Sequence, residues 1–347
     1  MKVLIRLYAH HRDRRGLGDC VQFTIVLKHI KKYHPNWEIY TETNSGKEGC
    51  FLGLVKHTYN VEYSPSNAKD FDRIIDVSFS EPNERTCELC VKHQLPATKT
   101  LSTIVDNLGL EPDRSLFGYS VEIPEKIRIM VKKYLNSLSI SKGLVTLHYR
   151  ANSWPHNKDI DESDMVRICN HLVENDYTPL ILDWKGTGIP DQKRIFCPTR
   201  ENSIWMGKPH GDASVIAAII ECSDLFVGVD SGPLHLAGST DTPTIAYWKY
   251  HHPVHFYDLA KNVLHLTPTE HLRYMKTPHK TGVDDYFQKN YNHKWYCGNR
   301  GDAVINAIDE ALKIENKIEN KIENKIKKFE PLITFGKDSW WAIKVRN

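Results

Sequence analysis

The sequence lacks the long apolar segments that mark a membrane protein. No stretch approaches the roughly 18 consecutive uncharged apolar residues that a membrane-spanning helix needs. The first residues, MKVLIRLYAHHRDRR, place apolar residues before the charged ones and contain no small-residue cleavage site. They therefore predict a first β-strand and not a signal peptide. Together these absences predict a cytoplasmic protein.

Cysteine is sparse for a chain of this length. Eight cysteines are spread over 347 residues, which excludes the dense disulfide framework of small secreted proteins and predicts reduced thiols. Cys87 and Cys90 form the only close pair, and a structural zinc site would need a second pair that the sequence does not supply. We therefore expect no metal site. The pair is interpreted as loop and helix-start residues, with metal or redox chemistry as the alternative.

Neither sign of charge dominates. The 46 Lys and Arg residues against 43 Asp and Glu residues give a net charge of +3, which is too small to predict nucleic-acid binding by itself but leaves nucleic acid open as a partner. A phosphate loop ending in GKS or GKT is absent, which argues against a kinase or NTPase. Gly16 and Gly18 do not make a dinucleotide-binding fingerprint, because the third glycine would fall at Val21.

Short β-branched runs alternate with amphipathic segments along most of the chain. This alternation predicts an α/β protein whose parallel strands carry helices on both faces. The length suits two domains of about 150 residues, and two such series meet near residue 139. We expect one domain over residues 1–138 and a second over 139–312. Strands are expected at 3–7, 37–43, 59–63, 73–79, 144–148, 180–183, 225–229, 244–248 and 263–266, and helices include 21–33, 125–138, 162–175 and 213–222.

The tail, residues 313–347, differs in sequence pattern from the rest of the chain. It repeats KIEN and places isoleucines four residues apart at 314, 318, 322 and 326. On a helix, this spacing rotates each isoleucine by about 40° around the axis relative to the previous one, so the isoleucines do not stay in one groove. The pattern predicts a weakly supported helical extension, with a coiled coil as the alternative. Residues 329–347 are apolar and aromatic again and are expected to dock back on the fold.

The segment GVDSGPLHLAGSTDTPTIAYW, residues 228–248, joins an apolar strand to a helix of small residues. A helix that starts directly after a strand points unpaired backbone N–H groups and a positive dipole end beyond the sheet, which suits an anion. Ser231 and Gly232 would let a phosphate approach these amides, and Pro233 is tolerated in the first turn. Asp230 would accept hydroxyl groups or orient the loop. A helix N-cap without any ligand is the alternative.

A longer segment, ECSDLFVGVDSGPLHLAGSTDTPTIAYW at residues 221–248, resembles the signature of glycosyltransferase family 9, the lipopolysaccharide heptosyltransferase group. The N-terminal half resembles the same family independently. It does so in KVLIRL at 2–7, in Gly18-Asp19 before an amphipathic helix, in HPNWEI at 34–39 and in TLSTIVDNLGLEPD at 100–113. The matching motifs follow the family's order over residues 1–266.

This resemblance implies a GT-B fold, in which two Rossmann-like domains face each other across a cleft. It implies that residues 1–138 bind the acceptor, that 139–312 bind a nucleotide-diphosphate sugar, and that 313–347 are an added extension. The implied reaction inverts the anomeric centre without a metal or further cofactor, and the expected donor is ADP- or UDP-linked. Asp19 matches the family's general base, with Gly18 beside it on the acceptor side. A helix N-cap is the alternative role of Asp19, and the two roles are compatible.

Further residues are assigned to the donor. The resemblance places Lys158 at the leaving diphosphate, where an ammonium would offset developing charge. Because Ile160-Asp161 stands where the family has Trp-Pro, a solvated surface lysine is the alternative.

Arg150, at the end of the preceding strand, is a second candidate cation. His235, one helical turn beyond Ser231, would reach the phosphates, with a structural histidine as the alternative. Asp183 and Trp184, at the end of a strand, are expected beside the nucleoside.

Two departures from the family pattern concern the substrates. The loop YAHHRDRRGLG is longer than in relatives and contains several cationic side chains, which are His10, His11, Arg12, Arg14 and Arg15. Guanidinium groups suit phosphate or carboxylate, so we expect an anionic acceptor, with a solvated basic loop as the alternative. After Trp248, KYHHPVHFYD replaces the usual Gly-Pro-Thr. Heptose is therefore not assumed as the sugar.

The sequence as a whole predicts a glycosyltransferase that moves a sugar to an anionic acceptor, such as a lipopolysaccharide, another envelope glycan precursor or a glycolipid. It is expected in the cytoplasm, with peripheral contact to the inner membrane face as an option. One alternative is an acceptor that is a nucleic-acid base or a protein. Another is a non-catalytic nucleotide-sugar-binding protein.

Overall fold

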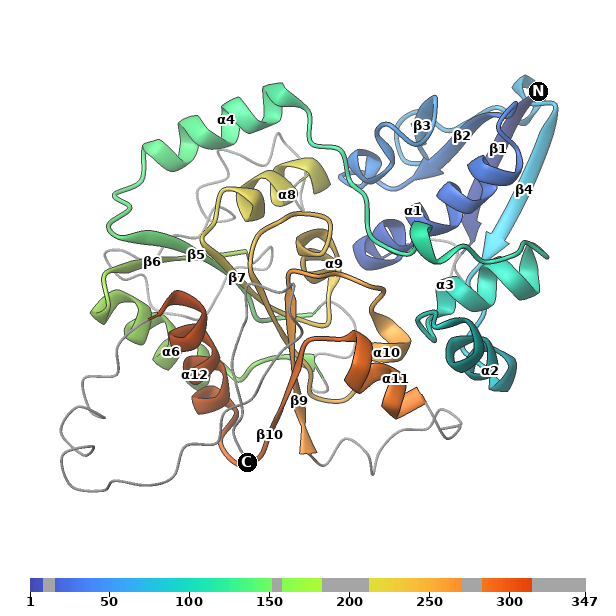
Figure 1. Cartoon of the computed structure of the whole chain (residues 1–347). Coiled ribbons are helices and arrows are strands. Elements are labelled where there is room, and N and C mark those ends of the chain that lie inside the picture. The colour runs from blue at the N-terminus through green and yellow to red at the C-terminus, as the bar shows by residue number, and fades with distance from the viewer. Residues whose placement is uncertain (9–15, 152–157, 183–211, 270–282, 314–347) are drawn as a thin grey trace.

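The computed structural model describes residues 1–8, 16–151, 158–182, 212–269 and 283–313. Their strands form two separate parallel sheets (Figure 1). The predicted α/β class with two parallel sheets is therefore confirmed. The predicted tail, including the KIEN repeat, lies outside the described residues.

The first sheet has four strands in the order β3-β2-β1-β4. They are β1 (Lys2–Tyr8), β2 (Glu38–Thr43), β3 (His57–Asn60) and β4 (Arg73–Ser78). All pairings are parallel, with Ile5 of β1 opposite Thr41 on one side and Ile75 on the other. The central strand β1 is fully buried at Val3, Leu4 and Ile5, as expected for a strand covered on both faces.

Helix α1 (Leu17–Tyr33) follows β1 and is buried along most of its length. The other elements of this half are short: η1 (Glu48–Phe51), η2 (Ala68–Asp70), α2 (Glu84–His93), α3 (Lys99–Ser102), η3 (Thr103–Asn107) and η4 (Arg114–Leu116). Next comes α4 (Glu125–Asn136), which crosses to the second half and packs against α8 (Ala213–Glu221) (Figure 1). The domain boundaries at 138 and 312 stay a prediction.

The second sheet has six parallel strands in the order β10-β9-β8-β7-β5-β6. They are β5 (Gly143–His148), β6 (Tyr177–Ile181), β7 (Leu225–Val229), β8 (Thr244–Tyr247), β9 (Val263–Pro268) and β10 (His293–Tyr296). Successive side chains of a strand face opposite sides, and each side is apolar here. Val145 and Leu147 of β5 pack on one face, while Leu144 packs on the other.

Each face of the second sheet has its own helices (Figure 1). Helices α6 (Glu162–Glu174) and α12 (Arg300–Leu312) contact each other and cover one face. On the other face lie α4, α8 and α9 (Gly232–Ala237). The short helices α10 (Pro253–Phe256) and α11 (Val283–Asn290) lie toward the first half, where α11 contacts α2.

The sequence placed some elements incorrectly. The strand expected at 180–183 begins earlier, at Tyr177, and includes Pro179. A proline is tolerated because β6 is an edge strand of the described sheet, where one side of the backbone needs no ladder partner. The strand expected at 59–63 is instead β3, which ends at Asn60 because the side-chain oxygen of that residue accepts hydrogen bonds from the N–H groups of Glu62 and Tyr63.

The two halves share one continuous apolar core. A single cluster includes Val21 and Phe23 of α1 together with Ile219 of α8 and Leu234 of α9. A buried polar contact adds to it. The Asp258 carboxyl, which follows α10 and is fully buried, accepts hydrogen bonds at Oδ1 from the hydroxyl groups of Thr98 at 2.7 Å and Thr100 at 2.8 Å.

Cys87 and Cys90 lie in α2 within a buried apolar cluster that also contains Tyr286 and Phe287 of α11. Burial raises the pKa of the Cys90 thiol to about 12, so this side chain stays protonated and unreactive at neutral pH. Among the described residues, no group of three or more His, Cys, Asp or Glu side chains could hold a metal ion. The pair therefore packs as part of the core between the two halves.

None of the helices that the structure describes is both long and apolar enough to cross a membrane.

Candidate functional site

The starts of α1 and α9 meet where the two halves touch (Figure 1). A Cβ atom built on Gly18 would lie 2.8 Å from Cδ2 of His235 and 3.7 Å from Cα of Gly232. One built on Gly232 would lie 2.6 Å from the Cβ of Leu17. Side chains larger than hydrogen do not fit at these distances, so the two glycines are what allows the backbones to approach. The contact brings the Gly18-Asp19 motif to the Asp230–Gly232 motif.

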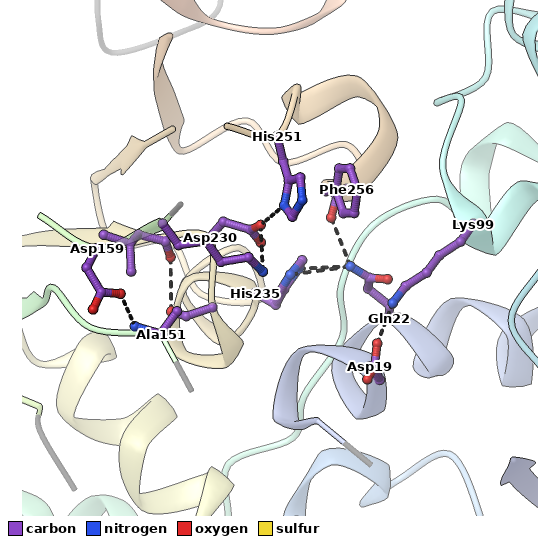
Figure 2. A network of polar contacts seen from close by, with 12 residues as sticks. Asp19, Gln22, Lys99, Ala151, Asp159, Asp230, His235, His251 and Phe256 are labelled. Atoms are coloured by element: carbon purple, nitrogen blue, oxygen red, sulfur yellow. Dashed lines mark hydrogen bonds and ion pairs between the residues drawn. The ribbon is translucent and has the colours of Figure 1, made fainter. Parts of the chain in front are cut away.

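Asp19 lies in the first turn of α1, with about a third of its side chain exposed. One carboxylate oxygen, Oδ2, accepts a hydrogen bond from the N–H of Gly16 at 3.2 Å, so the expected helix-start role is present, although the N-cap residue is Gly16. The other oxygen, Oδ1, pairs with the Nζ atom of Lys99 (Figure 2). Burial raises the pKa of Asp19, but the charge and hydrogen bond of Lys99 outweigh it and hold the pKa below its usual value.

Sequence reasoning missed Lys99. It is the first residue of α3, directly before the TLSTIVDNLGLEPD segment that carried the family resemblance. Its Nζ atom lies 4.5 Å from the centre of the Phe79 ring, within the range of a cation–π contact. A lysine beside a recognised motif was the available signal, but its partner is 80 positions away and only the fold reveals the pair.

Asp230 follows the buried strand β7 and is itself buried. Its Oδ2 atom lies 2.9 Å from Nζ of Lys158 and 2.7 Å from Nδ1 of His251 (Figure 2 shows the contact with His251). Burial raises the pKa of Asp230, but Lys158 and then His251 outweigh it and hold the pKa far below its usual range. The carboxylate is therefore ionised and oriented by two donors. His251 was not singled out from the sequence, although it lies in the segment that departs from the family pattern.

His251 is held from a second side. Its ring stacks on Phe256, with centroids 4.0 Å apart and an angle of 14° between the planes. The backbone oxygen of Phe256 in turn accepts a hydrogen bond from Nε2 of Gln22 on α1, at 2.9 Å. A chain of contacts therefore joins Asp230 to the helix that carries Asp19 (Figure 2).

His235 lies buried in α9, between the two halves. The side-chain nitrogen of Gln22, which only donates, lies 3.3 Å from Nε2 of His235, so that ring nitrogen accepts. The proton is then on Nδ1, which donates to the hydroxyl of Tyr119 at 2.9 Å. Burial lowers the pKa of His235 to about 4, so the ring is neutral at pH 7. Both ring nitrogens have protein partners, and the predicted phosphate contact stays a prediction.

Ser231 is the N-cap residue of α9, but its hydroxyl caps no backbone N–H. It donates instead to the backbone oxygen of Val229 at 3.0 Å and accepts from Nδ1 of His148 at 2.9 Å. Pro233 lies in the first turn, as predicted. Ser231 therefore occupies the N-cap position, as in the alternative interpretation, but its hydroxyl turns back toward the end of β7 and makes no cap hydrogen bond.

Arg150 lies just beyond β5 and pairs with Glu162 at 3.3 Å, and its guanidinium lies 5.0 Å from the centre of the Tyr149 ring. Its role at the donor stays a prediction. The other predicted site residues, which are His11, Arg12, Arg14 and Arg15 on the acceptor side and Asp183 and Trp184 on the donor side, lie outside the described residues.

The comparison with protein families bears on this half of the site. The model for glycosyltransferase family 9 (heptosyltransferase) matches residues 213–290, which include α8, Asp230, α9 and His251. Over this segment, less than a quarter of the chain, the sequence is similar to that family. The resemblance inferred from the motifs is confirmed, and with it the expectation that the chain is a glycosyltransferase.

Solved structures agree on the fold. A glycosyltransferase family 9 protein of Veillonella parvula superimposes with a TM-score of 0.57 and 14% identity, over 90% of this chain and 98% of that one. The Escherichia coli ADP-heptose lipopolysaccharide heptosyltransferase II superimposes with a TM-score of 0.55 and 11% identity, over 76% of this chain and 90% of that one. At these identities the likeness concerns the fold, and the expected GT-B architecture is confirmed. A search among curated proteins gave no significant match.

Proposed function

We propose that the protein transfers a sugar from a nucleotide-diphosphate sugar to a hydroxyl group of an anionic acceptor, with inversion at the anomeric carbon. The single observation that carries this proposal is the contact between the starts of α1 and α9. It places an ionised carboxylate of the first half beside the family 9 segment of the second. A base and a donor site must lie this close for direct transfer between two bound substrates.

Asp19 serves as the general base. Its carboxylate takes the proton from the acceptor hydroxyl, whose oxygen forms the new bond to the anomeric carbon. The bond between that carbon and the diphosphate oxygen breaks on the opposite face, and its electron pair leaves with the diphosphate. The exposed third of the Asp19 side chain is where an acceptor hydroxyl would approach.

The diphosphate is bound at the start of α9. Phosphate oxygens would accept hydrogen bonds from the backbone amides there, which the Ser231 hydroxyl does not occupy. Lys158, which is largely buried, supplies an ammonium group within 2.9 Å of Asp230. Neutralisation of the leaving group by Lys158 and the amides requires no metal ion, and metal independence is part of the proposal.

Asp230 is assigned to the sugar. A carboxylate repels phosphate oxygens but accepts hydrogen bonds from hydroxyl groups, so its place is at the sugar end of the donor. Lys158 and His251 both contact Oδ2, and the Asp230 carboxylate is held in one orientation by them. The two partners of this ion pair would then contact different parts of the donor. Lys158 would lie toward the diphosphate and Asp230 toward the sugar hydroxyl groups.

The sequence supports the proposed acceptor and the proposed cellular location. The basic residues of the 9–15 loop favour an anionic envelope glycan or glycolipid precursor, and an ADP-linked sugar is the first donor to test, because a related fold is that of an ADP-heptose transferase. The proposed setting is the cytoplasm, at the inner face of the membrane.

Thermal-shift measurements with ADP-, UDP-, GDP- and CMP-linked sugars test the donor site. One nucleotide class should raise the melting temperature, because a ligand that binds only the folded state stabilises it. Asp19→Asn should keep this shift and lower transfer by about 100- to 10,000-fold, the usual contribution of a general base. Stabilisation by none of the four classes, or full transfer by Asp19→Asn, would contradict the proposal.

A further inference from the structure

The surroundings of Lys99 suggest a role beyond that of a structural ion pair. Its side chain is 18% exposed and reaches Asp19 from α3, an element separate from the helix that carries the base. The Phe79 ring lies beneath the ammonium group. Lys99 is therefore fixed from two sides next to the carboxylate that the proposed function uses as base.

An ammonium group has three N–H bonds to donate. Among the described residues, Nζ of Lys99 makes one hydrogen bond, to Oδ1 of Asp19, and its other contact is with the face of Phe79. An aromatic face accepts weakly, so at least one N–H remains for a strong acceptor. An acceptor hydroxyl bound at Asp19 would bring its neighbouring groups within reach of that N–H.

We propose that Lys99 is a positioning residue that bridges the base Asp19 and an anionic group, phosphate or carboxylate, next to the reacting hydroxyl of the acceptor. This inference rests on the proposed function and names the recognition element that the described part of the chain contributes to the acceptor.

The bridge couples acceptor binding to base strength. In the free protein, Lys99 holds the pKa of Asp19 below its usual value, which makes a weak base. An anion on the same ammonium offsets that charge, so the pKa of Asp19 rises when an acceptor of the right kind binds. The other groups facing the carboxylate are the Gly16 N–H and His235, whose own pKa of about 4 keeps it neutral above pH 5. The charge of Lys99 also acts on the Asp258 carboxyl and lowers the pKa of that group.

The test follows the Asp19 carboxyl by carbon-13 NMR in the full chain. Its pKa is measured alone, with inorganic phosphate and with acetate, for the wild type and for Lys99→Gln. We expect the pKa to be higher in Lys99→Gln than in the wild type. We also expect phosphate, acetate or both to raise it in the wild type only, and the ion that does so identifies the anionic group. No response of the wild type to either ion, or an equal response of the variant, would overturn the bridge.

Two further variants complete the design. Lys32→Gln removes a surface lysine paired at 2.6 Å with Asp113, and should leave the Asp19 titration unchanged. Lys99→Arg keeps the cation and should retain part of the response to anions. If Lys99→Gln does not fold, the comparison of Lys99→Arg with the wild type still tests the bridge. Loss of the anion-induced rise in the Asp19 pKa in Lys99→Arg, which keeps a cation at position 99, would contradict the bridge.

Kinetics extend the test once a donor and an acceptor are known. Lys99→Gln should lower kcat/KM for an anionic acceptor by about 10- to 100-fold, the loss expected for a hydrogen bond to a charged group, and shift the acid limb of its pH profile upward. Donor hydrolysis should change little. The NMR measurement does not need turnover. A wild type that binds no nucleotide sugar would therefore refute the proposed function, whereas an unresponsive Asp19 would refute only the bridge.

Discussion

Asp258 offers a test of the interface between the two halves through the pH dependence of stability. Burial raises the pKa of its carboxyl to about 6, although the hydroxyl groups of Thr98 and Thr100 and the more distant charges of Lys28 and Lys99 act in the opposite direction. The unfolded chain should titrate near the ordinary value of 3.8. Between these values the folded protein binds more protons at this site than the unfolded chain does.

The sign and size of the effect follow by linkage. Because the folded state holds the proton more tightly, the free energy of unfolding falls as pH rises from about 4 to about 6, and the loss is complete above pH 6. A difference of about 2 pKa units at 1.36 kcal/mol each corresponds to about 3 kcal/mol. Asp258→Asn keeps an oxygen for the two hydroxyl groups and cannot ionise.

Urea denaturation of the wild type and of Asp258→Asn at several pH values between 4 and 8 measures the effect. All other groups titrate in both proteins, so the difference between their unfolding free energies isolates Asp258. As pH rises, the unfolding free energy of the wild type should fall by about 3 kcal/mol relative to that of Asp258→Asn. Asp113→Asn is the matched control. Lys32 and Ser115 hold the pKa of Asp113 below its usual range, so its contribution changes below about pH 4 and the Asp113→Asn difference should stay nearly flat over the range measured. A flat difference for Asp258→Asn would refute the reasoning.

The remaining predictions concern the contact between the halves and the donor site. Gly18→Ala should lower the free energy of unfolding by about 1–3 kcal/mol in urea, because its Cβ would lie 2.8 Å from the His235 ring. Gly118→Ala, whose Cβ would meet only the Leu259 oxygen at 3.7 Å, should cost little, and equal losses would argue against the close approach. In calorimetry, His251→Leu should weaken nucleotide-sugar binding by about tenfold and leave nucleoside-diphosphate binding unchanged. His251→Asn, which retains an N–H near the position of Nδ1, should recover part of the loss. A similar loss for both ligands would remove His251 from the sugar end.

The sequence predicted most of the fold because most strands of the second sheet are buried on both faces. Continuous apolar runs such as LFVGV in β7 clearly predict buried strands. The small-residue helix α9 that follows β7 could be recognised from its proline and glycines. Strand β10, with the sequence HKWY, was missed because four partly polar residues give no period. Helix α12 was also not predicted, although its Asn299 cap was a usable signal.

The site was predicted in part. The motifs identified Asp19, in the first turn of α1, and Asp230, directly after β7, because the family resemblance relates the two segments. The side chains that set the charge of these carboxylates were not found. Lys99 and His251 are separated from their partners by 80 and 21 positions, and neither spacing carries a local signal. Such pairs depend on how one half of the molecule docks on the other, which periodicity does not describe.

The apolar cluster shared by α1, α8 and α9 has a consequence for how the protein folds. Either half made alone would expose to water the surface that the other half covers, and would be prone to aggregate. Separate expression of residues 1–138 and 139–347 should therefore give insoluble fragments, whereas co-expression should allow them to reassemble. The intact chain should melt in one cooperative transition.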